Sequence, residues 1–202
     1  GSHPRAVRLF LREARAGAAL SHRNIVTRFD AGQEGDQYFL TMELLEGLSL
    51  HDLLGRRGKL SARDAARLGA QACAGLDYAH GQGVVHRDIK TSNLFFTQDR
   101  VVKIMDFGLA KMTEEVRRAA TVVGGTPYYM APEQAAGDDV DPRADQYALG
   151  VTLFELVTGD VPFKTGDVTY HHRHTAPPDP RAAAPHLPEA LVTLILRLMA
   201  KR

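Results

Sequence analysis

The sequence is poor in cysteine, nearly balanced in charge and without any long apolar run. Cys73 is the only cysteine, so the chain cannot form an internal disulfide, and a reducing, cytoplasmic setting fits this composition. The formal net charge of +1 at pH 7 argues against nucleic acid or an anionic membrane as partners, because both select concentrated positive charge. No apolar stretch approaches the roughly 20 residues that a membrane-spanning helix needs, so no membrane segment is expected.

What is present is ordinary for one globular domain, with 44% hydrophobic and 24% charged residues among 202. The apolar pattern predicts helices over 4–20, 50–54, 144–158 and 189–200, and a further helix that begins at Ser61 and has an apolar face up to Ala79. Extended segments predict strands over 25–29 and 37–43 joined by a turn at 30–36, and a small hairpin over 94–104. Residues 109–130 and 159–188 are predicted as loops, the second with one short helix.

Three local patterns sharpen this outline. Ser61 followed by Asp64 is typical of a helix start, where the two side chains bind free backbone N–H groups. Helix 144–158 is apolar almost all round, which indicates burial. The run His171–His174 lies in a proline-rich segment without paired ligands at a fixed helical spacing, so no metal site is expected there. Cys73 is expected to act only as a small apolar residue on a helix.

The segment that carries chemistry is His86-Arg87-Asp88-Ile89-Lys90-Thr91-Ser92-Asn93. Asp106-Phe107-Gly108 begins thirteen residues after Asn93, and Ala131-Pro132-Glu133 begins 25 residues after Asp106. Any one of these motifs is a weak signal, but three in this order and spacing are specific. The chain resembles the protein serine/threonine kinase catalytic domain of the bacterial, eukaryotic-like type.

The resemblance implies an α+β, protein-kinase-like fold that binds ATP and Mg²⁺ and phosphorylates Ser or Thr hydroxyls of protein substrates. Residues 1–44 match part of the N-terminal lobe, namely helix αC and two strands. Residues 45–202 match the mainly helical C-terminal lobe with its catalytic and activation loops.

Phosphoryl transfer requires groups that aim the substrate hydroxyl and neutralise charge. By resemblance, Asp88 accepts the hydroxyl proton, and Lys90 places a positive charge beside the transferring phosphoryl group. Asn93 and Asp106 offer the oxygen ligands that Mg²⁺ prefers. In the family, the residues matching His86 and Phe107 pack in a stacked hydrophobic spine, and the one matching Asp145 bonds the backbone near the catalytic loop.

Two further regions match parts of the nucleotide site. Glu13 resembles the αC glutamate that pairs with the phosphate-binding lysine. Residues 38–47 resemble the strand and hinge that hold adenine, with Met42 as gatekeeper and the backbone of Glu43 and Leu45 bonding the purine. Phe95 is expected in the pocket floor. A simple alternating strand explains the same apolar residues without a ligand.

Residues 109–130 match the activation loop, whose hydroxyls are Thr113, Thr121 and Thr126. Thr126, in Gly125-Thr126-Pro127, resembles the threonine that orders the substrate loop beside Asp88 and Lys90. Thr121 is therefore the expected phosphorylation site, with Arg87 gripping the phosphate. Gly124-Gly125 makes the segment one residue longer than the commonest spacing, which leaves the choice of phosphosite open.

The sequence lacks a Gly-x-Gly-x-x-Gly loop, a Val-Ala-x-Lys strand before Glu13, and the arginine that usually pairs with Glu133. We therefore expect a domain truncated before αC and after αH, inactive as this fragment although its parent is an active kinase. The alternative is a non-catalytic, pseudokinase-like binding module, although the presence of Asp88, Asn93 and Asp106 argues against it. A weaker alternative is a small-molecule phosphotransferase of related fold, against which Lys90 and the segment from Thr126 to Glu133 argue.

Overall fold

The computed structural model describes residues 19–35, 37–107 and 127–201. Their helices are α2 (Leu50–Arg57), α3 (Ala62–Gly81), α5 (Pro132–Ala136), α6 (Arg143–Thr158), α7 (Val168–His174) and α8 (Glu189–Leu198), with the 3₁₀ turns Thr91–Asn93 and Pro180–Ala182. One antiparallel sheet pairs β1 (Arg28–Glu34) with β2 (Gln37–Met42), and a second has the order β3 (Gly47–Ser49), β4 (Leu94–Thr97), β5 (Val102–Ile104). The α+β class is confirmed.

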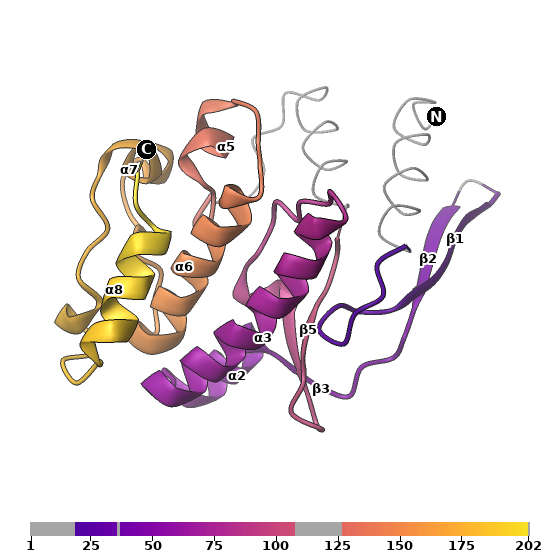
Figure 1. Cartoon of the computed structure of the whole chain (residues 1–202), viewed down its shortest axis with the longest axis horizontal. Coiled ribbons are helices and arrows are strands. Elements are labelled where there is room, and N and C mark those ends of the chain that lie inside the picture. Colours follow the sequence, from indigo (N-terminus) through magenta and orange to yellow (C-terminus); the bar gives the residue numbers. More distant parts are fainter. Residues whose placement is uncertain (1–18, 36, 108–126, 202) are drawn as a thin grey trace.

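The helical body is built around α6, which lies between α3 and α8 (Figure 1). Thirteen of the sixteen residues of α6 are buried, as predicted from the pattern of 144–158, which is apolar almost all round. The helices approach closely because glycines lie at the crossings. A Cβ atom on Gly69 would come within 2.8 Å of Leu153, and one on Gly150 within 2.8 Å of Leu198.

Helix α3 begins where the sequence predicts. The Ser61 hydroxyl accepts the Asp64 N–H at 3.1 Å, which satisfies one helix N-terminal group that would otherwise lack a partner. The Asp64 carboxylate accepts a hydrogen bond from the Ser61 hydroxyl at 2.9 Å rather than from a backbone N–H as predicted. The apolar face of α3 is buried at Ala65, Leu68, Ala72, Leu76 and Ala79. Cys73 lies on the exposed side of the helix as a free thiol.

The predicted turn at 30–32 is wrong, because β1 continues to Glu34 and the chain turns at Gly35. Pairing with β2 outweighs the local turn preference of Asp30-Ala31-Gly32. Gly32 stands opposite Phe39, and a Cβ atom there would come within 2.7 Å of the Phe39 ring. The glycine therefore makes room for an aromatic side chain across the sheet.

Other differences concern short elements. Strand β3 was not predicted, because its three residues begin at Gly47, which indicates a break rather than a strand. The helix predicted over 50–54 extends to Arg57 and is capped by Ser49, whose side chain accepts the Asp52 N–H. Helix α5 was not predicted, because the sequence pattern indicated no element over residues 131–143.

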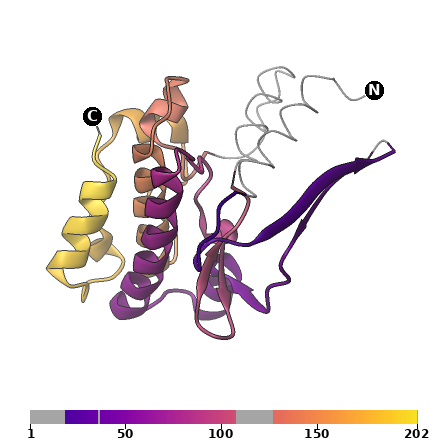
Figure 2. The same ribbon diagram turned by 45° about the vertical axis from the view of Figure 1, so that its right-hand side comes forward.

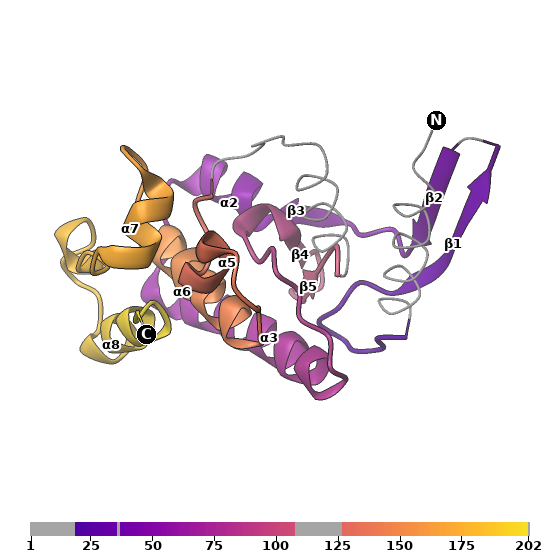
Figure 3. The ribbon, with the colours of Figure 1, turned by 90° about the horizontal axis from the view of Figure 1, so that it is seen from above.

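The backbone join between the two sheets that the described residues show lies where residues 24–26 run parallel to the end of β5. The Val26 N–H donates to the Ile104 carbonyl at 3.0 Å, and the Ile104 N–H donates to the Asn24 carbonyl at 2.9 Å. Beyond this join the β1–β2 sheet projects from the body (Figure 2). Seen from above, the β3–β5 sheet lies between that projection and the helical body (Figure 3).

At the other end of the molecule, a histidine is buried beneath the C-terminal segment. The His172 Nδ1 atom lies 2.8 Å from the Tyr147 hydroxyl, which also accepts a hydrogen bond from Lys201 at 2.6 Å. Because an ammonium only donates, the hydroxyl proton points to His172, whose Nδ1 is then unprotonated. The Lys201 ammonium also lies 5.1 Å from the centre of the Phe163 ring.

Candidate active site

The loop that follows α3 is fixed by one buried carboxylate. Asp145 lies in the first turn of α6 and is fully buried. Its two oxygens accept the backbone N–H groups of His86 at 2.8 Å and Arg87 at 2.7 Å, and the His80 ring lies 2.8 Å away. The predicted bonding of Asp145 to the backbone near the catalytic loop is confirmed. Charge-assisted bonds of this kind hold the segment before Asp88 in one conformation.

Asp88, Lys90 and Asn93 come together on this loop. The Asn93 side-chain amide donates to the Asp88 carbonyl at 2.8 Å and to its Oδ2 at 3.2 Å. The Lys90 Nζ lies 2.9 Å from the same Oδ2. Within the part of the chain that the structure describes, the other oxygen of Asp88 has no hydrogen bond. The Asp88 carboxylate is half-exposed, oriented on one side and free to accept a proton on the other.

His86 is a packing residue with a defined tautomer. Its Nδ1 accepts the Asp88 N–H at 3.1 Å, and its Nε2 lies 2.6 Å from the Met105 carbonyl. Since a carbonyl only accepts, Nε2 carries the proton. The buried ring meets the edge of Phe107 with centroids 4.6 Å apart. The predicted packing of His86 and Phe107 is confirmed, and it connects the catalytic loop to Asp106.

Asn93 and Asp106 are brought to adjacent positions by one backbone bond, from the Met105 N–H to the Asn93 carbonyl at 2.9 Å. The Asn93 amide group is used as a donor to Asp88, so its side-chain oxygen remains available. Asp106 has φ of 61° and Arg87 has φ of 71°, conformations that cost non-glycine residues free energy and cluster at functional sites. An amide oxygen beside a carboxylate fits Mg²⁺, which completes its shell with water and phosphate oxygens.

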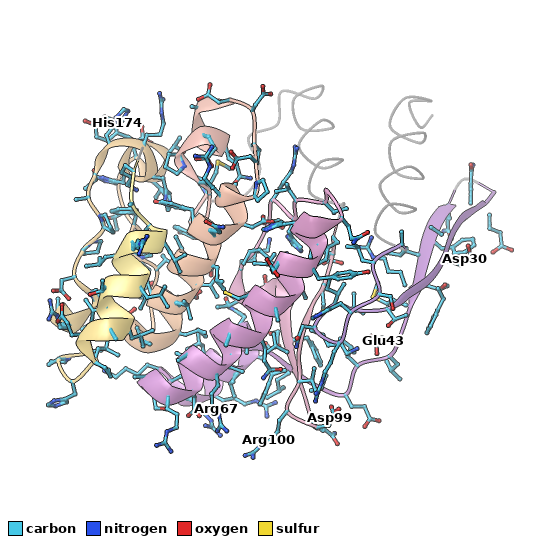
Figure 4. The ribbon with its side chains drawn as sticks, in the orientation of Figure 1. Asp30, Glu43, Arg67, Asp99, Arg100 and His174 are labelled. Atoms are coloured by element: carbon cyan, nitrogen blue, oxygen red, sulfur yellow. The ribbon has the colours of Figure 1, made fainter. Side chains whose placement is uncertain are left out.

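The predicted hinge is anchored by an ion pair. The Glu43 carboxylate lies 2.6 Å from the Lys103 Nζ of β5 and accepts the Thr27 N–H at 2.7 Å. Burial acts to raise the pKa of Glu43, but the bonds from Lys103 and Thr27 outweigh it and lower that pKa overall. Figure 4 places Glu43 between the projecting sheet and the body, where β2 ends. The side chain of Glu43 is thus a structural clamp.

The other predicted adenine-site residues lie on both sides of this clamp. Met42 ends β2, Leu45 lies in the segment that leads to β3, and Phe95 lies on β4 next to Ser49 of β3. All three are half-buried. Among the described residues, no hydrogen bond uses the Glu43 carbonyl or the Leu45 N–H. These are the backbone groups predicted to bond a purine.

Two polar links to the catalytic loop were missed by sequence reasoning. The Gln134 side chain on α5 donates to the Arg87 carbonyl at 2.9 Å. The Tyr129 hydroxyl donates to the Glu155 carboxylate at 2.6 Å and lies 3.2 Å from the Thr91 hydroxyl. Burial and the carboxylate of Glu155 raise the pKa of Tyr129, which therefore remains a neutral donor. Glu155, a charged residue in the second half of the helix predicted over 144–158, is the signal that could have indicated such a partner.

Three predicted functional residues, Glu13, Thr121 and Thr126, lie outside the described residues. So does most of the helix predicted over 4–20. Within the described part, no helix has the length and hydrophobicity to cross a bilayer, and no group of three or more His, Cys, Asp or Glu side chains could hold a metal ion.

Residues 3–200 match the protein kinase domain family. The chain belongs to this family.

The chain is 38% identical over 204 residues to serine/threonine-protein kinase PknB of Mycobacterium tuberculosis, an alignment that covers 95% of this chain and 32% of that protein. It is 38% identical to the probable serine/threonine-protein kinase PknB of Bifidobacterium longum, over 95% of this chain and 30% of that protein. A probable serine/threonine-protein kinase of Clostridium perfringens is also 38% identical, over 96% of this chain and 29% of the relative. The chain thus spans about a third of the length of these relatives.

Proposed function

We propose that this chain carries the catalytic core of a serine/threonine protein kinase that transfers the γ-phosphoryl group of ATP to Ser or Thr hydroxyls of proteins. One observation supports the proposal above others. Asp88 is held by Asn93 and Lys90 on a loop fixed by buried Asp145, and Asp106 lies next to Asn93. The proposal is supported because this arrangement combines a carboxylate that can accept a proton, a cation, and two oxygens of the kind that Mg²⁺ prefers.

Each residue has one role in the proposed reaction. The free side of the Asp88 carboxylate accepts the hydrogen bond and then the proton of the substrate hydroxyl, which it aims at the phosphorus atom. Lys90 places its charge beside the transferring group. Asn93 and Asp106 would hold Mg²⁺, which neutralises phosphate charge when bound.

The segment 43–45 supports a nucleotide as the phosphate donor. The Glu43 carbonyl and the Leu45 N–H would bond the purine edge, with Met42 and Phe95 bordering the ring. Glu13 is proposed to pair with a phosphate-binding lysine. Thr126 is proposed to order the substrate loop, and phosphorylated Thr121 to bind Arg87.

The role of Asp88 is tested with Asp88→Asn in the full-length gene product. The amide keeps the size but cannot take the proton, so phosphate transfer from Mg-ATP to casein should fall at least about a hundredfold. Asp139→Asn, at an exposed carboxylate, should retain normal turnover. Near-normal turnover by Asp88→Asn would overturn the assignment. A full-length protein that binds a kinase partner but never transfers phosphate would instead support the binding-module alternative.

We further propose that the 202 residues alone transfer phosphate poorly. They contain no glycine-rich loop to cover the ATP phosphates and no Val-Ala-x-Lys sequence before Glu13. The loop over the phosphates and the lysine that binds them are therefore both missing from these residues. An assay of residues 1–202 beside the full-length product tests this. Comparable Mg-ATP-dependent rates in both would show that these elements are dispensable.

A further inference from the structure

Arg28 is a buried cation in a position that the proposed catalytic machinery does not use. It begins β1 opposite Met42, and only 5% of its surface is exposed. Both terminal nitrogens of its guanidinium group are buried and lack a hydrogen-bond partner within the described part of the chain. The register of the sheet shifts between Arg28 and Asp30, and Phe29 points outward with 66% exposed. The strand irregularity therefore accompanies an arginine that points inward.

The backbone brings Arg28 and Asp106 to the same end of the join between the two sheets. Residues 25 and 104 form a parallel bridge, and the Val26 N–H bonds the Ile104 carbonyl at 3.0 Å. Arg28 lies three residues beyond Ile25, the bridge partner of Ile104, and Asp106 lies two residues beyond Ile104. Because the two segments run in the same direction, both residues leave the join at the same end.

The side chains interact by charge without a hydrogen bond. Burial lowers the pKa of the Arg28 guanidinium, and the Asp106 carboxylate acts in the opposite direction. Arginine nevertheless stays protonated at neutral pH. The Asp106 carboxylate has no hydrogen bond of its own among the described residues. A buried guanidinium without partners is costly, and a nearby carboxylate is what reduces that cost.

We propose that Arg28 is an internal counter-ion of Asp106 that competes with the divalent cation for this carboxylate. This inference rests on the proposed function, in which Asp106 is a metal ligand. Without metal, the positive charge of Arg28 balances the carboxylate. When a divalent cation binds, the two positive charges repel one another in a partly water-excluded site. Arg28 thereby raises the metal concentration that the site requires.

Arg28 and Asp106 share no hydrogen bond, and this determines whether removing Arg28 strengthens or weakens metal binding. A guanidinium bonded to both carboxylate oxygens would orient Asp106 for the metal, and its removal would weaken metal binding. Arg28 makes no such bond, so it acts through charge alone, and its removal should strengthen metal binding.

The test measures Mn²⁺ binding to the full-length gene product by electron paramagnetic resonance of the free ion, with a non-hydrolysable ATP analogue present. Arg28→Met keeps the length of the side chain and removes the charge, and it should bind Mn²⁺ about tenfold more tightly. Arg28→Lys keeps the charge and should remain within about threefold of the unaltered protein. Arg23→Leu removes an exposed arginine from the neighbouring turn and should leave Mn²⁺ affinity unchanged.

A second measurement needs no metal. In buffer with a chelator, urea unfolding is compared for Arg28→Met, Asp106→Asn and the double variant. If the two residues are counter-ions, the double variant should be less destabilised than the two single effects predict together. If Arg28→Met does not fold, Arg28→Lys is compared in proteins with and without Asp106→Asn. In the Asp106→Asn protein the buried cation has no carboxylate to balance it. The cation at position 28, whether arginine or lysine, should therefore lower the free energy of unfolding more there than in the protein that retains Asp106.

Unchanged or weaker Mn²⁺ binding by folded Arg28→Met, or additive effects in the unfolding cycle, would overturn the counter-ion role. Another result of the same experiment would show instead that the metal site in the proposed function is wrong. If the unaltered protein and Asp106→Asn bind Mn²⁺ equally, Asp106 is no metal ligand, and the competition falls with it.

Discussion

At the scale of single residues, Asp145 contributes most to holding the catalytic loop in its conformation. Its carboxylate accepts two backbone N–H groups of the catalytic loop and contacts His80 while fully buried. In Asp145→Asn, one of the acceptor oxygens becomes an amide donor that faces another donor. We expect a loss of about 3 kcal/mol in the free energy of unfolding, typical when one member of a buried charged network is removed.

Urea unfolding of the 202-residue chain measures this loss. Asp160→Asn is the matched control, because Asp160 forms an exposed ion pair with Lys164 that contributes at most about 1 kcal/mol. Similar destabilisation by both substitutions would contradict the role of Asp145.

His172 gives the molecule a defined response to acid. Burial, with the Lys201 charge second, lowers the pKa of His172 from 6.5 to about 4. The unfolded chain therefore takes up a proton near pH 6.5 that the folded chain takes up only near pH 4. Stability is fully present above pH 6.5 and falls as the pH is lowered from there to 4, by about 3 kcal/mol from this group.

Chemical unfolding at pH values between 7 and 4 tests the assignment. His172→Gln should flatten the pH dependence in this window, although it also lowers stability throughout. His174→Gln should leave the slope unchanged, because His174 is exposed on the outer side of the same helix (Figure 4). An unaltered slope in His172→Gln would show that other groups cause the acid response.

The residues of the catalytic loop could be placed from sequence because their order and spacing are fixed by shared chemistry. The structure indeed brings Asp88, Lys90 and Asn93 together. Arg28 could not be recognised, since an arginine in a short strand normally reaches solvent. Its burial depends on the join between residues 24–26 and β5, which no local pattern encodes. Gln134 was missed for the same reason, because its partner lies 47 positions away.

At the scale of elements, close helix packing depends on particular glycines. A Cβ atom on Gly75 of α3 would come within 2.8 Å of the Ile104 side chain and 3.0 Å of the Asn24 carbonyl. That carbonyl accepts the Ile104 N–H, so a methyl group would press on the join between the sheets. Gly75→Ala should destabilise the chain by about 1–2 kcal/mol, because crowding outweighs the better helix propensity of alanine.

Gly55→Ala on α2 supplies the contrast. A Cβ atom there would have no packing neighbour within 4 Å, so the substitution changes only the helix propensity. The free energy of unfolding should therefore rise by roughly 0.5–1 kcal/mol. Thermal melting of the two variants distinguishes the cases. Stabilisation by both would indicate that Gly75 has more room than its surroundings suggest.

Helix boundaries were predicted best where a cap and a periodic face agree, as at Ser61 and α3. They were predicted worst where the decisive partner is distant in space. The segment Asp30-Ala31-Gly32 has turn-forming residues, yet pairing with residues 39–41 makes it strand. Three-residue β3 is defined only by its pairing with β4. Local preference is worth tenths of a kcal/mol per residue and yields to such pairing.

At the scale of the whole molecule, stability should be uneven. The β1–β2 sheet projects from the body, and Phe29, Phe39 and Leu44 are exposed. In contrast, α6 is buried almost throughout. In the 202-residue chain, amide hydrogens of residues 30–42 should exchange at least about a hundredfold faster than those of 148–156. Hydrogen exchange with mass spectrometry measures this, and equal protection of the two regions would contradict it.

The exposed thiol of Cys73 makes the arrangement of the two sheets measurable in solution. It is the only cysteine in the chain, and it lies on α3, within the helical body. A fluorophore attached there by maleimide chemistry, and a second on Glu34→Cys at the far end of the projecting sheet, would form a spectroscopic ruler. Although Cys73 as a residue is exposed on α3, partial burial of its sulfur and then the charge of Asp77 raise the pKa of the thiol, so labelling should be slow at neutral pH and faster near pH 9. The introduced thiol, free of this effect, should react first, which allows the two dyes to be attached in a chosen order.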